Sequence, residues 1–328
     1  MIASLSGPNN DSAHIRRLDV YRDLDAVADL IEDSFPIQQD ADGVTYIAQM
    51  RKSAREMRYL QRLSGLANLE TSALPRGLVW VEGGRIVGNL TLIPFERGGE
   101  TFHLIANVAV DRAYRRRGIA RALTQRAIAD LRRKHGKEIW LQVRADNAGA
   151  QALYRAVGFT DQLARTTWRI RPERMTSKSG EADPSLQTSR RRAEDWSMQR
   201  KWLADAYPAK MRWNLPVEFT RFEPGALQAI SNFMHGVRLR HWSVGREEQL
   251  MGVASWQRTA TFADNLWLAM DPATEAKALP VLLRYVLRRR PAGHPLSIDY
   301  PMDRNPEIFQ RLGFHNFRTL IWMRCSLG

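Results

Sequence analysis

The stretch VDRAYRRRGIARALTQRA, residues 110–127, places three consecutive arginines and a glycine directly before a helical pattern. Ile119, Leu123 and Ala127 recur at the spacing of one helix face. A glycine turn that opens a helix gathers unpaired backbone N–H groups at the positive end of the helix dipole, and this combination binds phosphate well. The stretch therefore predicts either a phosphate site or a solvated basic turn.

The length and composition of the chain predict a folded protein of two domains. It has 328 residues, of which 44% are hydrophobic and 26% charged, and domains usually contain about 100–200 residues. No run approaches the roughly 18–20 apolar residues of a membrane span, and the first fifteen residues lack the basic start and apolar stretch of a secretory signal. The single cysteine, Cys325, suits a reducing compartment. We therefore expect a cytoplasmic protein without a membrane partner.

The formal charge of +14 raises the question of nucleic-acid binding. Residues 1–172 carry 26 Lys and Arg against 19 Asp and Glu, and the remainder carries 23 against 16, so each half has a net charge of +7. A nucleic-acid interface normally concentrates positive charge on one element or face. The even spread indicates compositional bias, and nucleic acid is not an expected partner.

Hydrophobic periodicity and turn residues predict alternating helices and strands in the first half. The expected elements, in order, are a strand and a helix within 14–35, a helix at 46–63, three strands within 77–110, a helix after Gly118, a strand at 139–143, a helix at 148–158 and a strand at 166–170. Gly83-Gly84 and Gly98-Gly99 separate the three strands within 77–110, which favours an antiparallel meander.

The second half appears as a repeat of the first. ANVAVD at 106–111 has a counterpart in DNLWLAMD at 264–271, and ALYRAVGF at 152–159 corresponds to EIFQRLGF at 307–314. Residues 173–195 are polar and unpatterned, which is typical of a linker. The sequence therefore predicts two copies of one α/β (α+β) unit, at 1–172 and 196–328, joined by a linker at 173–195.

The segments 106–123 and 139–159 carry the most specific motifs, and together they resemble the GNAT superfamily of acyl-CoA-dependent N-acyltransferases. The resemblance covers roughly residues 14–171 in element order. It implies two tandem GNAT-like domains, each a mixed, mostly antiparallel central sheet flanked by helices. It also implies acetyl-CoA as cosubstrate and no metal.

The resemblance assigns the coenzyme to the end of one strand and the turn that follows. The family's Arg/Gln-x-x-Gly-x-Gly/Ala turn, which holds the pyrophosphate through backbone amides, matches residues 115–120. The preceding strand end would hold the pantetheine arm and orient the thioester carbonyl, and the family's Asn contacts the pantetheine region. The residues implied in coenzyme binding are Val108, Ala109, Val110, Arg115, Arg116, Arg117, Gly118, Ile119, Ala120, Arg121 and Asn147.

The resemblance also implies one catalytic residue, Tyr154, as the proton donor to the departing thiolate. A tyrosine with a pKa of about 10 is a usable acid for a thiolate. Amine attack on the thioester creates an oxyanion that the backbone amide of Val110 would stabilise, and no covalent enzyme intermediate is needed. Both polar residues also have structural interpretations, since Tyr154 could pack at a helix–strand junction and Asn147 could cap a helix.

The sequence assigns no general base. The strand before the turn offers His103 and Asn107 but no carboxylate, and Glu32, Asp33 and Glu82 are also compatible with plain solvated charge.

The second copy departs from the pattern at the turn. An ungapped alignment places Glu275 there and finds no glycine or arginine cluster, and Phe309 replaces Tyr154. A carboxylate beside a pyrophosphate is repulsive, so this copy is expected to bind coenzyme A poorly.

Three functions compete on this evidence. The leading interpretation is an N-acetyltransferase that moves an acetyl group from acetyl-CoA to a primary amine of a small molecule, peptide or protein. The alternative is a non-catalytic acyl-CoA-binding or sensing module, although such a module would not need Tyr154. A basic RNA- or ribosome-associated protein would instead show binding that weakens steeply with salt. The sequence sets neither the acceptor nor the oligomeric state.

Overall fold

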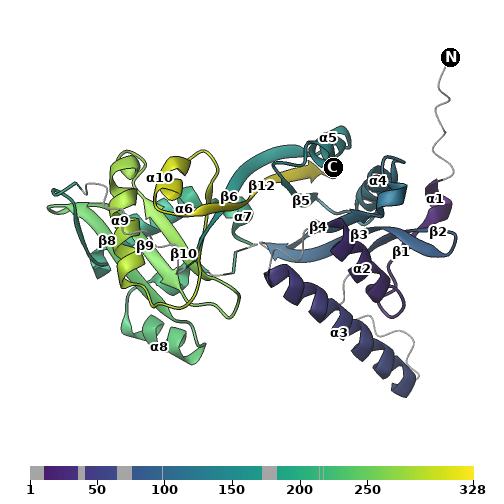
Figure 1. Cartoon of the computed structure of the whole chain (residues 1–328), viewed down its shortest axis with the longest axis horizontal. Coiled ribbons are helices and arrows are strands. Elements are labelled where there is room, and N and C mark those ends of the chain that lie inside the picture. The colour runs from purple at the N-terminus through teal and green to yellow at the C-terminus, as the bar shows by residue number, and fades with distance from the viewer. Residues whose placement is uncertain are drawn as a thin grey trace, which may run out of the picture. The chain divides into compact units, whose positions relative to one another are not determined.

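The computed structural model describes residues 11–35, 41–64, 76–97, 99–171, 183–213, 215–216 and 218–328. The chain forms two compact units (Figure 1). The first consists of Met1–Gln162 together with Trp322–Gly328, and the second of Leu163–Ile321.

The first unit is a mixed sheet in the strand order β1-β2-β3-β4-β5-β12-β6. Its strands are β1 (Ile15–Arg17), β2 (Arg76–Glu82), β3 (Arg85–Arg97), β4 (Glu100–Val110), β5 (Glu138–Arg144) and parts of β6 (Thr160–Ile170) and β12 (His315–Ser326). Strands β1 to β4 pair antiparallel in succession, and β4 pairs with β5 in parallel. The predicted meander is therefore confirmed.

Helices cover both faces of this sheet, with α4 and α5 on one face and α2 and α3 on the other (Figure 1). The helical elements are α1 (Asp11–His14), α2 (Leu24–Ser34), α3 (Ala41–Ser64), the 3₁₀ turn η2 (Arg112–Tyr114), α4 (Ile119–Arg133) and α5 (Ala148–Ala156). Ile119, Leu123 and Ala127 of α4 are all buried. The helix face predicted from their spacing is thus the face that packs on the sheet.

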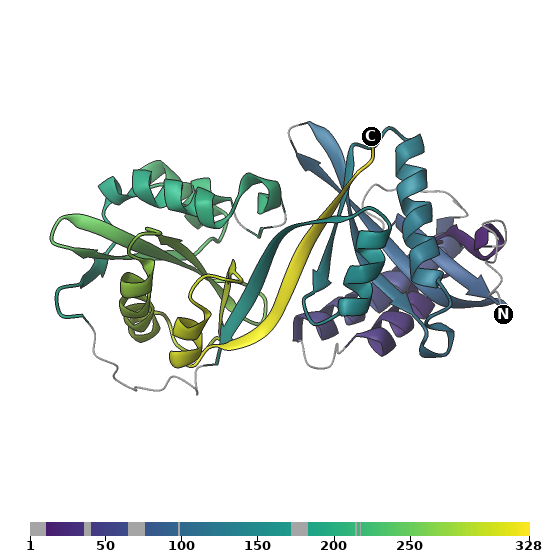
Figure 2. The ribbon, with the colours of Figure 1, turned by 90° about the horizontal axis from the view of Figure 1, so that it is seen from above.

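The second unit repeats this plan in the strand order β12-β6-β11-β10-β9-β8-β7. Its strands are β7 (Gln187–Arg190), β8 (Leu239–Arg246), β9 (Gln249–Gln257), β10 (Asp264–Met270) and β11 (Leu296–Pro301), with parts of β6 and β12. Its helical elements are η4 (Ala193–Asp195), α6 (Trp196–Ala206), α7 (Ala209–Arg212), η5 (Phe219–Phe222), α8 (Ala226–Met234), α9 (Glu275–Arg289) and α10 (Pro306–Arg311). Figure 2 shows α6 and α9 on opposite faces of this sheet.

The two copies agree in the hydrogen bonds that follow their central strands. The Asp111 amide donates to the Val87 carbonyl at 2.9 Å, and the Asp271 amide donates to the Met251 carbonyl at 3.0 Å. Each aspartate side chain then accepts the amide two residues further on, at 2.8 Å and 3.1 Å respectively. Asp111 and Asp271 are therefore equivalent positions, which fixes the alignment of the repeats.

Each unit is completed by a strand from a distant part of the sequence. In the first unit, the Leu327 amide donates to the Lys137 carbonyl at 2.9 Å, next to β5. In the second, β6 pairs with β11 from Leu296↔Ile170 to Pro301↔Arg165. The units therefore differ from the expected division at 1–172 and 196–328. Because the two closing strands have similar sequences, RTTWRI and RTLIWMR, the pattern does not reveal which sheet each one completes.

The segment expected to be a linker, 173–195, is partly ordered structure. Residues 173–182 lie outside the described residues, but β7 and η4 lie within 183–195. Strand β7 pairs antiparallel with β8, from Gln187↔Gly245 to Arg190↔Trp242. The linker expectation is wrong for this part, because a short polar strand at a sheet edge lacks the apolar alternation that would identify it.

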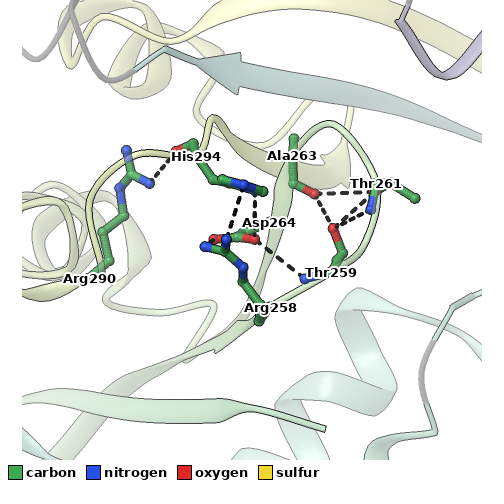
Figure 3. A network of polar contacts seen from close by, with 7 residues as sticks. All are labelled: Arg258, Thr259, Thr261, Ala263, Asp264, Arg290 and His294. Carbon is green, nitrogen blue, oxygen red and sulfur yellow. Dashed lines mark hydrogen bonds and ion pairs between the residues drawn. The ribbon is translucent and has the colours of Figure 1, made fainter. Parts of the chain in front are cut away.

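A polar network surrounds Asp264, the first residue of β10 (Figure 3). Asp264 is fully buried, and its carboxylate lies 3.5 Å from both Arg258 Nη1 and His294 Nδ1. The Thr259 amide donates to the same carboxylate at 3.3 Å, and Arg290 Nη1 donates to the His294 carbonyl at 2.6 Å. A buried carboxylate needs such partners, so this network has a structural role in holding the β9–β10 loop.

Within the described ranges, no helix is both long and apolar enough to cross a membrane.

Candidate active site

Strands β4 and β5 pair over a short distance and then part. The parallel ladder runs from His103↔Ile139 to Ile105↔Leu141. Strand β4 continues to Val110 and β5 to Arg144 without further pairs between them. The Val110 and Arg144 carbonyls at the two strand ends accept from Arg115 Nε and the Asn147 amide. The remaining facing backbone groups lack a strand partner and can bind a ligand, as backbone polar groups need a partner.

A β-bulge in β4 accounts for this divergence. Asn89 pairs with Ala109 and Thr91 pairs with Ala106, so two residues of β4 lie opposite one residue of β3. Asn107, inside the bulge, has φ of +51°. The buried Asn89 side chain donates from Nδ2 to the Asn107 carbonyl at 2.8 Å. A bulge bends its strand and increases the local twist, and here it turns β4 away from β5.

The turn between β4 and α4 has the backbone of an anion site. Arg116 and Gly118 both adopt left-handed conformations, with φ of +63° and +85°. Gly118 is the N-terminal cap of α4 and has no side-chain cap bond. Among the described residues, none accepts a hydrogen bond from the amides of 116–121. These amides and the helix dipole converge on one place, which suits a phosphate group.

The three consecutive arginines have different surroundings. Arg115 Nε donates to the Val110 carbonyl at 3.0 Å, so its guanidinium lies against the end of β4. The Arg117 guanidinium stacks over the Tyr114 ring at 4.9 Å. Arg116 is exposed. All three flank the turn and raise its positive potential, while only Arg115 also contacts the strand end.

The other turn and strand residues predicted to bind coenzyme differ in how far they are buried. The Ala109 and Ile119 side chains are 2% exposed and belong to the core. Val108, Val110 and Ala120 are half-buried. Arg121, in the first turn of α4, is exposed beside these residues. The apolar side chains of Ala109 and Ile119 are therefore part of the core, and coenzyme binding by these residues stays a prediction.

Asn147 is a helix cap. Its Oδ1 accepts the Ala150 amide at 3.0 Å at the start of α5. Its Nδ2 has no hydrogen-bond partner among the described residues and is exposed. The structural interpretation is therefore observed, and the side chain still has a donor to offer a ligand.

Tyr154 lies in α5 with 8% of its surface exposed, packed edge-on against Phe159 at a centroid distance of 5.9 Å. Burial raises the pKa of its phenol to about 12. The hydroxyl is therefore protonated at neutral pH. Since an ordinary thiol has a pKa of about 8.5, such a phenol stabilises a thiolate by donating a hydrogen bond more than by giving up its proton.

Comparison with known proteins identifies this arrangement. Residues 25–159 match the model of the acetyltransferase (GNAT) family. This segment of the chain is therefore similar to the GNAT family.

Curated relatives match over shorter segments. The [ribosomal protein bS18]-alanine N-acetyltransferase of Escherichia coli K12 is 42% identical over 62 residues, which are 19% of this chain and 42% of the relative. The N-alpha-acetyltransferase RimI of Mycobacterium tuberculosis is 36% identical over 105 residues, 31% of this chain and 65% of the relative. The chain thus spans less than two thirds of the length of either relative.

Solved structures match over nearly the whole chain. A tandem GNAT protein from the clavulanic acid biosynthesis pathway is 18% identical with a TM-score of 0.50, covering 96% of this chain and 98% of that one. A GCN5-related N-acetyltransferase from Sphaerobacter thermophilus is 14% identical with a TM-score of 0.56, covering 96% of each chain. At these identities the likeness concerns the fold, and it confirms the prediction of two tandem GNAT-like domains.

The structure adds detail on the groups considered as a base in the first GNAT unit. Burial and neighbouring cations lower the pKa of His103, whose Nδ1 is buried without a hydrogen-bond partner among the described residues. Glu32 is paired with Arg51 Nη2 at 2.7 Å, and Glu82 accepts from Trp80 Nε1 at 3.3 Å. These carboxylates already have partners. Asp33 is exposed and makes no hydrogen bond or ion pair among the described residues, and we assign no base. The described residues also contain no group of three or more His, Cys, Asp or Glu that could hold a metal.

One residue near the bulge was missed by sequence reasoning. Tyr46 of α3 lies with its hydroxyl 2.8 Å from Asn107 Nδ2. The available signal was a polar residue, Asn107, within an otherwise apolar strand. No local pattern indicates that its partner lies 61 residues earlier in a helix.

The second GNAT-like unit keeps the strand divergence but fills it. Strands β10 and β11 pair only at Asp264↔Leu296 and Asn265↔Ser297. Beyond these pairs, the fully buried Tyr207 places its hydroxyl 3.3 Å from the Leu268 amide and accepts its hydrogen bond.

A second buried side chain, Arg165, completes the filling. Its guanidinium stacks on the Tyr207 ring at 4.7 Å, and its Nη1 donates to the Ala206 carbonyl at 2.7 Å. At this divergence the Leu268 amide of β10 donates to Tyr207, and the Asp299 carbonyl of β11 accepts from Arg165 Nη2 at 2.9 Å.

The second unit also lacks the phosphate turn. Seven residues, 112–118, separate Asp111 from α4, whereas only 272–274 separate the equivalent Asp271 from α9. Relative to the equivalent aspartates, α9 therefore begins four residues earlier than α4. The ungapped alignment of the two turns is wrong, because the second copy has a four-residue deletion here.

Glu275 occupies the positive end of α9. It is 3% exposed, and its Oε1 accepts from the Tyr300 hydroxyl and from Asn305 Nδ2, both at 3.0 Å. Arg304 pairs with its other oxygen. The negative charge favoured at a helix start is supplied here by a side chain of the chain itself.

Proposed function

We propose that the first unit binds acetyl-CoA and transfers its acetyl group to a primary amine. The observation that carries this proposal is the turn at 115–118, where the amides of 116–121 converge at the start of α4 without protein acceptors. A side chain built on Gly118 would meet no atom within 4 Å, so the protein leaves the space beside these amides open. The residues fit a pyrophosphate with flanking arginines.

In this proposal the divergence of β4 and β5 receives the pantetheine arm. The backbone of Val108, Ala109 and Val110 lies at the strand end that no longer pairs with β5. Asn147 contributes the free donor of its side chain. The thioester is then held between the strand end and α5, which supplies the proximity that accelerates acyl transfer.

The chemical step is a direct attack. The amine nitrogen forms a bond to the thioester carbon and loses a proton to water. The carbon–sulfur bond breaks as the oxyanion collapses, and the coenzyme leaves as its thiolate. The Val110 amide is placed to stabilise the oxyanion. The Tyr154 hydroxyl, which stays protonated because its pKa is raised to about 12, donates a hydrogen bond to the departing sulfur.

For the acceptor we propose an amine of a peptide or protein. Two relatives that match part of this chain, a ribosomal protein alanine N-acetyltransferase and an N-alpha-acetyltransferase, support this choice. The aligned segments cover less than two thirds of each relative, so the acceptor rests on this proposal.

The deciding experiment measures acetyl-CoA-dependent thiol release by the purified chain with peptides, lysine derivatives and small amines. Titration calorimetry with acetyl-CoA alone accompanies it. Binding with amine-dependent thiol release supports the acetyltransferase. Binding without thiol release for any amine favours the acyl-CoA-binding module, and absence of binding contradicts the site itself.

A further inference from the structure

The hydroxyl of Tyr46 reaches the bulge at the point where β4 leaves β5. We propose, on the basis of the acetyltransferase function above, that Tyr46 recognises the acceptor by donating a hydrogen bond to the first carbonyl of a peptide N-terminus. The Asn107 side chain positions this hydroxyl, at 2.8 Å. The unit would thereby select the α-amine of a peptide over the side-chain amine of a lysine.

The direction of the hydrogen bond leaves the tyrosine proton available. Asn107 Nδ2 is an N–H donor, so the Tyr46 oxygen accepts. A phenol that accepts one hydrogen bond retains its own O–H as a donor. Burial raises the pKa of Tyr46, so this donor persists at neutral pH. The pair therefore presents one oriented O–H group.

The bulge places this group beside the reacting atoms of the proposed reaction. Asn107 immediately precedes Val108, where the backbone stretch proposed for the thioester begins. The Asn107 backbone is fixed from the other side, because the buried Asn89 donates to its carbonyl at 2.8 Å. Tyr46 remains 42% exposed, so an acceptor can approach it.

The chemistry of the acceptor decides what this donor can bind. The attacking amine needs its lone pair for the thioester, so a donor bound to that nitrogen would block the reaction. A peptide N-terminus carries a carbonyl oxygen three bonds from the amine nitrogen. A lysine side chain has only methylene groups over that distance. The Tyr46 hydroxyl therefore has a partner in the first acceptor and none in the second.

Two variants test the inference with acetyl-CoA and two peptides, one with a free α-amine and one with a blocked N-terminus and a lysine. Tyr46→Phe should raise KM for the α-amine peptide about 5-fold, the value of one neutral hydrogen bond, without raising KM for the lysine peptide or Kd for acetyl-CoA. Asn107→Asp should raise the same KM by a similar factor. Its carboxylate accepts a hydrogen bond from the Tyr46 hydroxyl, which is then no longer free to donate to the peptide. Aspartate tolerates the positive φ at this position.

Coupling and a matched control complete the design. The double variant should be no weaker than either single variant, since both remove one hydrogen bond. Val44→Ala, on the same helix and similarly exposed at 43%, should leave both KM values unchanged. Thermal unfolding of every variant accompanies the kinetics.

Equal losses on both peptides, additive losses in the double variant or an unchanged KM in Tyr46→Phe would each overturn the assignment of Tyr46. A wild-type chain that acetylates lysine but not the α-amine peptide would also overturn it while leaving the acetyltransferase function in place. If none of the tested amines supports thiol release, the proposed function and this inference are both wrong.

Discussion

Both units contain a pair of parallel strands that diverge, but they differ in whether protein groups bind the backbone amides near that divergence. In the first, β4 and β5 part after Ile105↔Leu141, and the amides of the following turn have no protein acceptor among the described residues. In the second, β10 and β11 part after Asn265↔Ser297, and Tyr207 takes the Leu268 amide. The fold therefore creates unpaired backbone groups in both copies, and the side chains decide whether a ligand or the protein satisfies them.

The difference extends to the helix that follows each strand. A turn with two left-handed residues precedes α4 and leaves its positive end open. In the second unit this turn is absent, and the buried Glu275 carboxylate lies in the first turn of α9. The electrostatic demand of a helix start is the same in both cases. The positive end of α4 is open to solvent, whereas that of α9 is neutralised by the Glu275 carboxylate.

The strongest way to break the contrast is to give the first turn the charge of the second. Gly118→Glu should weaken acetyl-CoA binding about 10³-fold, because a carboxylate within ~4 Å of a phosphate at a partly screened site costs about 4 kcal/mol. The added side chain has open space around it, so the unit should remain folded despite the positive φ. Titration calorimetry on the folded variant provides the measurement.

A matched neutral change separates charge from backbone strain. Asn tolerates positive φ better than Glu, so Gly118→Asn should lose far less affinity. Unchanged affinity in folded Gly118→Glu would show that the pyrophosphate binds elsewhere.

The second comparison concerns Tyr154 and its counterpart in the second copy, Phe309. Tyr154→Phe should lower the rate of the chemical step about 10²-fold, the low end of the range for a general acid, because the hydroxyl donates a hydrogen bond to the departing sulfur and keeps its proton. The coenzyme affinity should stay the same. Single-turnover kinetics combined with calorimetry separates the two, and an unchanged chemical rate would remove Tyr154 from the mechanism.

The pH dependence gives an independent reading of the same residue. The pKa of Tyr154 is raised to about 12, so its protonated form is retained as the pH rises and is lost only near that value. The acid form of an ordinary tyrosine would be half lost at about pH 10. The chemical rate of the wild type should therefore show no decline from this residue between pH 8 and 10. A decline in that window that Tyr154→Phe abolishes would contradict the raised pKa.

Local features of the first unit followed from the sequence. The spacing of Ile119, Leu123 and Ala127 predicted the buried face of α4, and Gly118 predicted the turn that precedes this helix. Short-range steric and hydrophobic effects determine such features, so a window of a few residues contains the necessary information.

Features that depend on long-range pairing did not follow. Strand β6 pairs with β11 of the second unit, and the end of β12 belongs to the first unit. The sequence does not reveal this assignment, because RTTWRI and RTLIWMR carry the same local pattern. The bulge at Asn107 depends on the register with β3, and the contact with Tyr46 joins residues 61 positions apart. The filling of the second divergence by Tyr207 likewise joins it to Leu268, 61 positions away. Periodicity in one segment contains no information on such partners.

The third comparison tests whether the second unit can bind a coenzyme once the Tyr207 hydroxyl is removed. Tyr207→Phe removes the acceptor of the buried Leu268 amide and should destabilise the chain by about 1–3 kcal/mol. The ring stays in place against Trp267, at 5.4 Å, so the variant should gain no coenzyme site. Chemical denaturation gives the stability. Calorimetry should give one acetyl-CoA per chain for both proteins, and a second equivalent site in either would contradict the closed state of this unit.

The smallest expected effect separates the two roles of Asn147, which in the first unit caps α5 and also carries a free donor. Removing both in Asn147→Ala should cost about 1 kcal/mol of stability, the usual value of a helix cap, and should weaken coenzyme binding a few-fold. Asn147→Asp keeps the oxygen that accepts the Ala150 amide but has no N–H to donate, so it should restore stability without restoring affinity. In the proposed binding mode residue 147 would contact the pantetheine arm rather than the pyrophosphate, so the new negative charge should cost much less affinity than that of Gly118→Glu. Denaturation and calorimetry on both variants provide the test. If Asn147→Asp recovered wild-type affinity along with stability, the side chain would act only as a cap, and the first divergence would hold the coenzyme by its backbone alone.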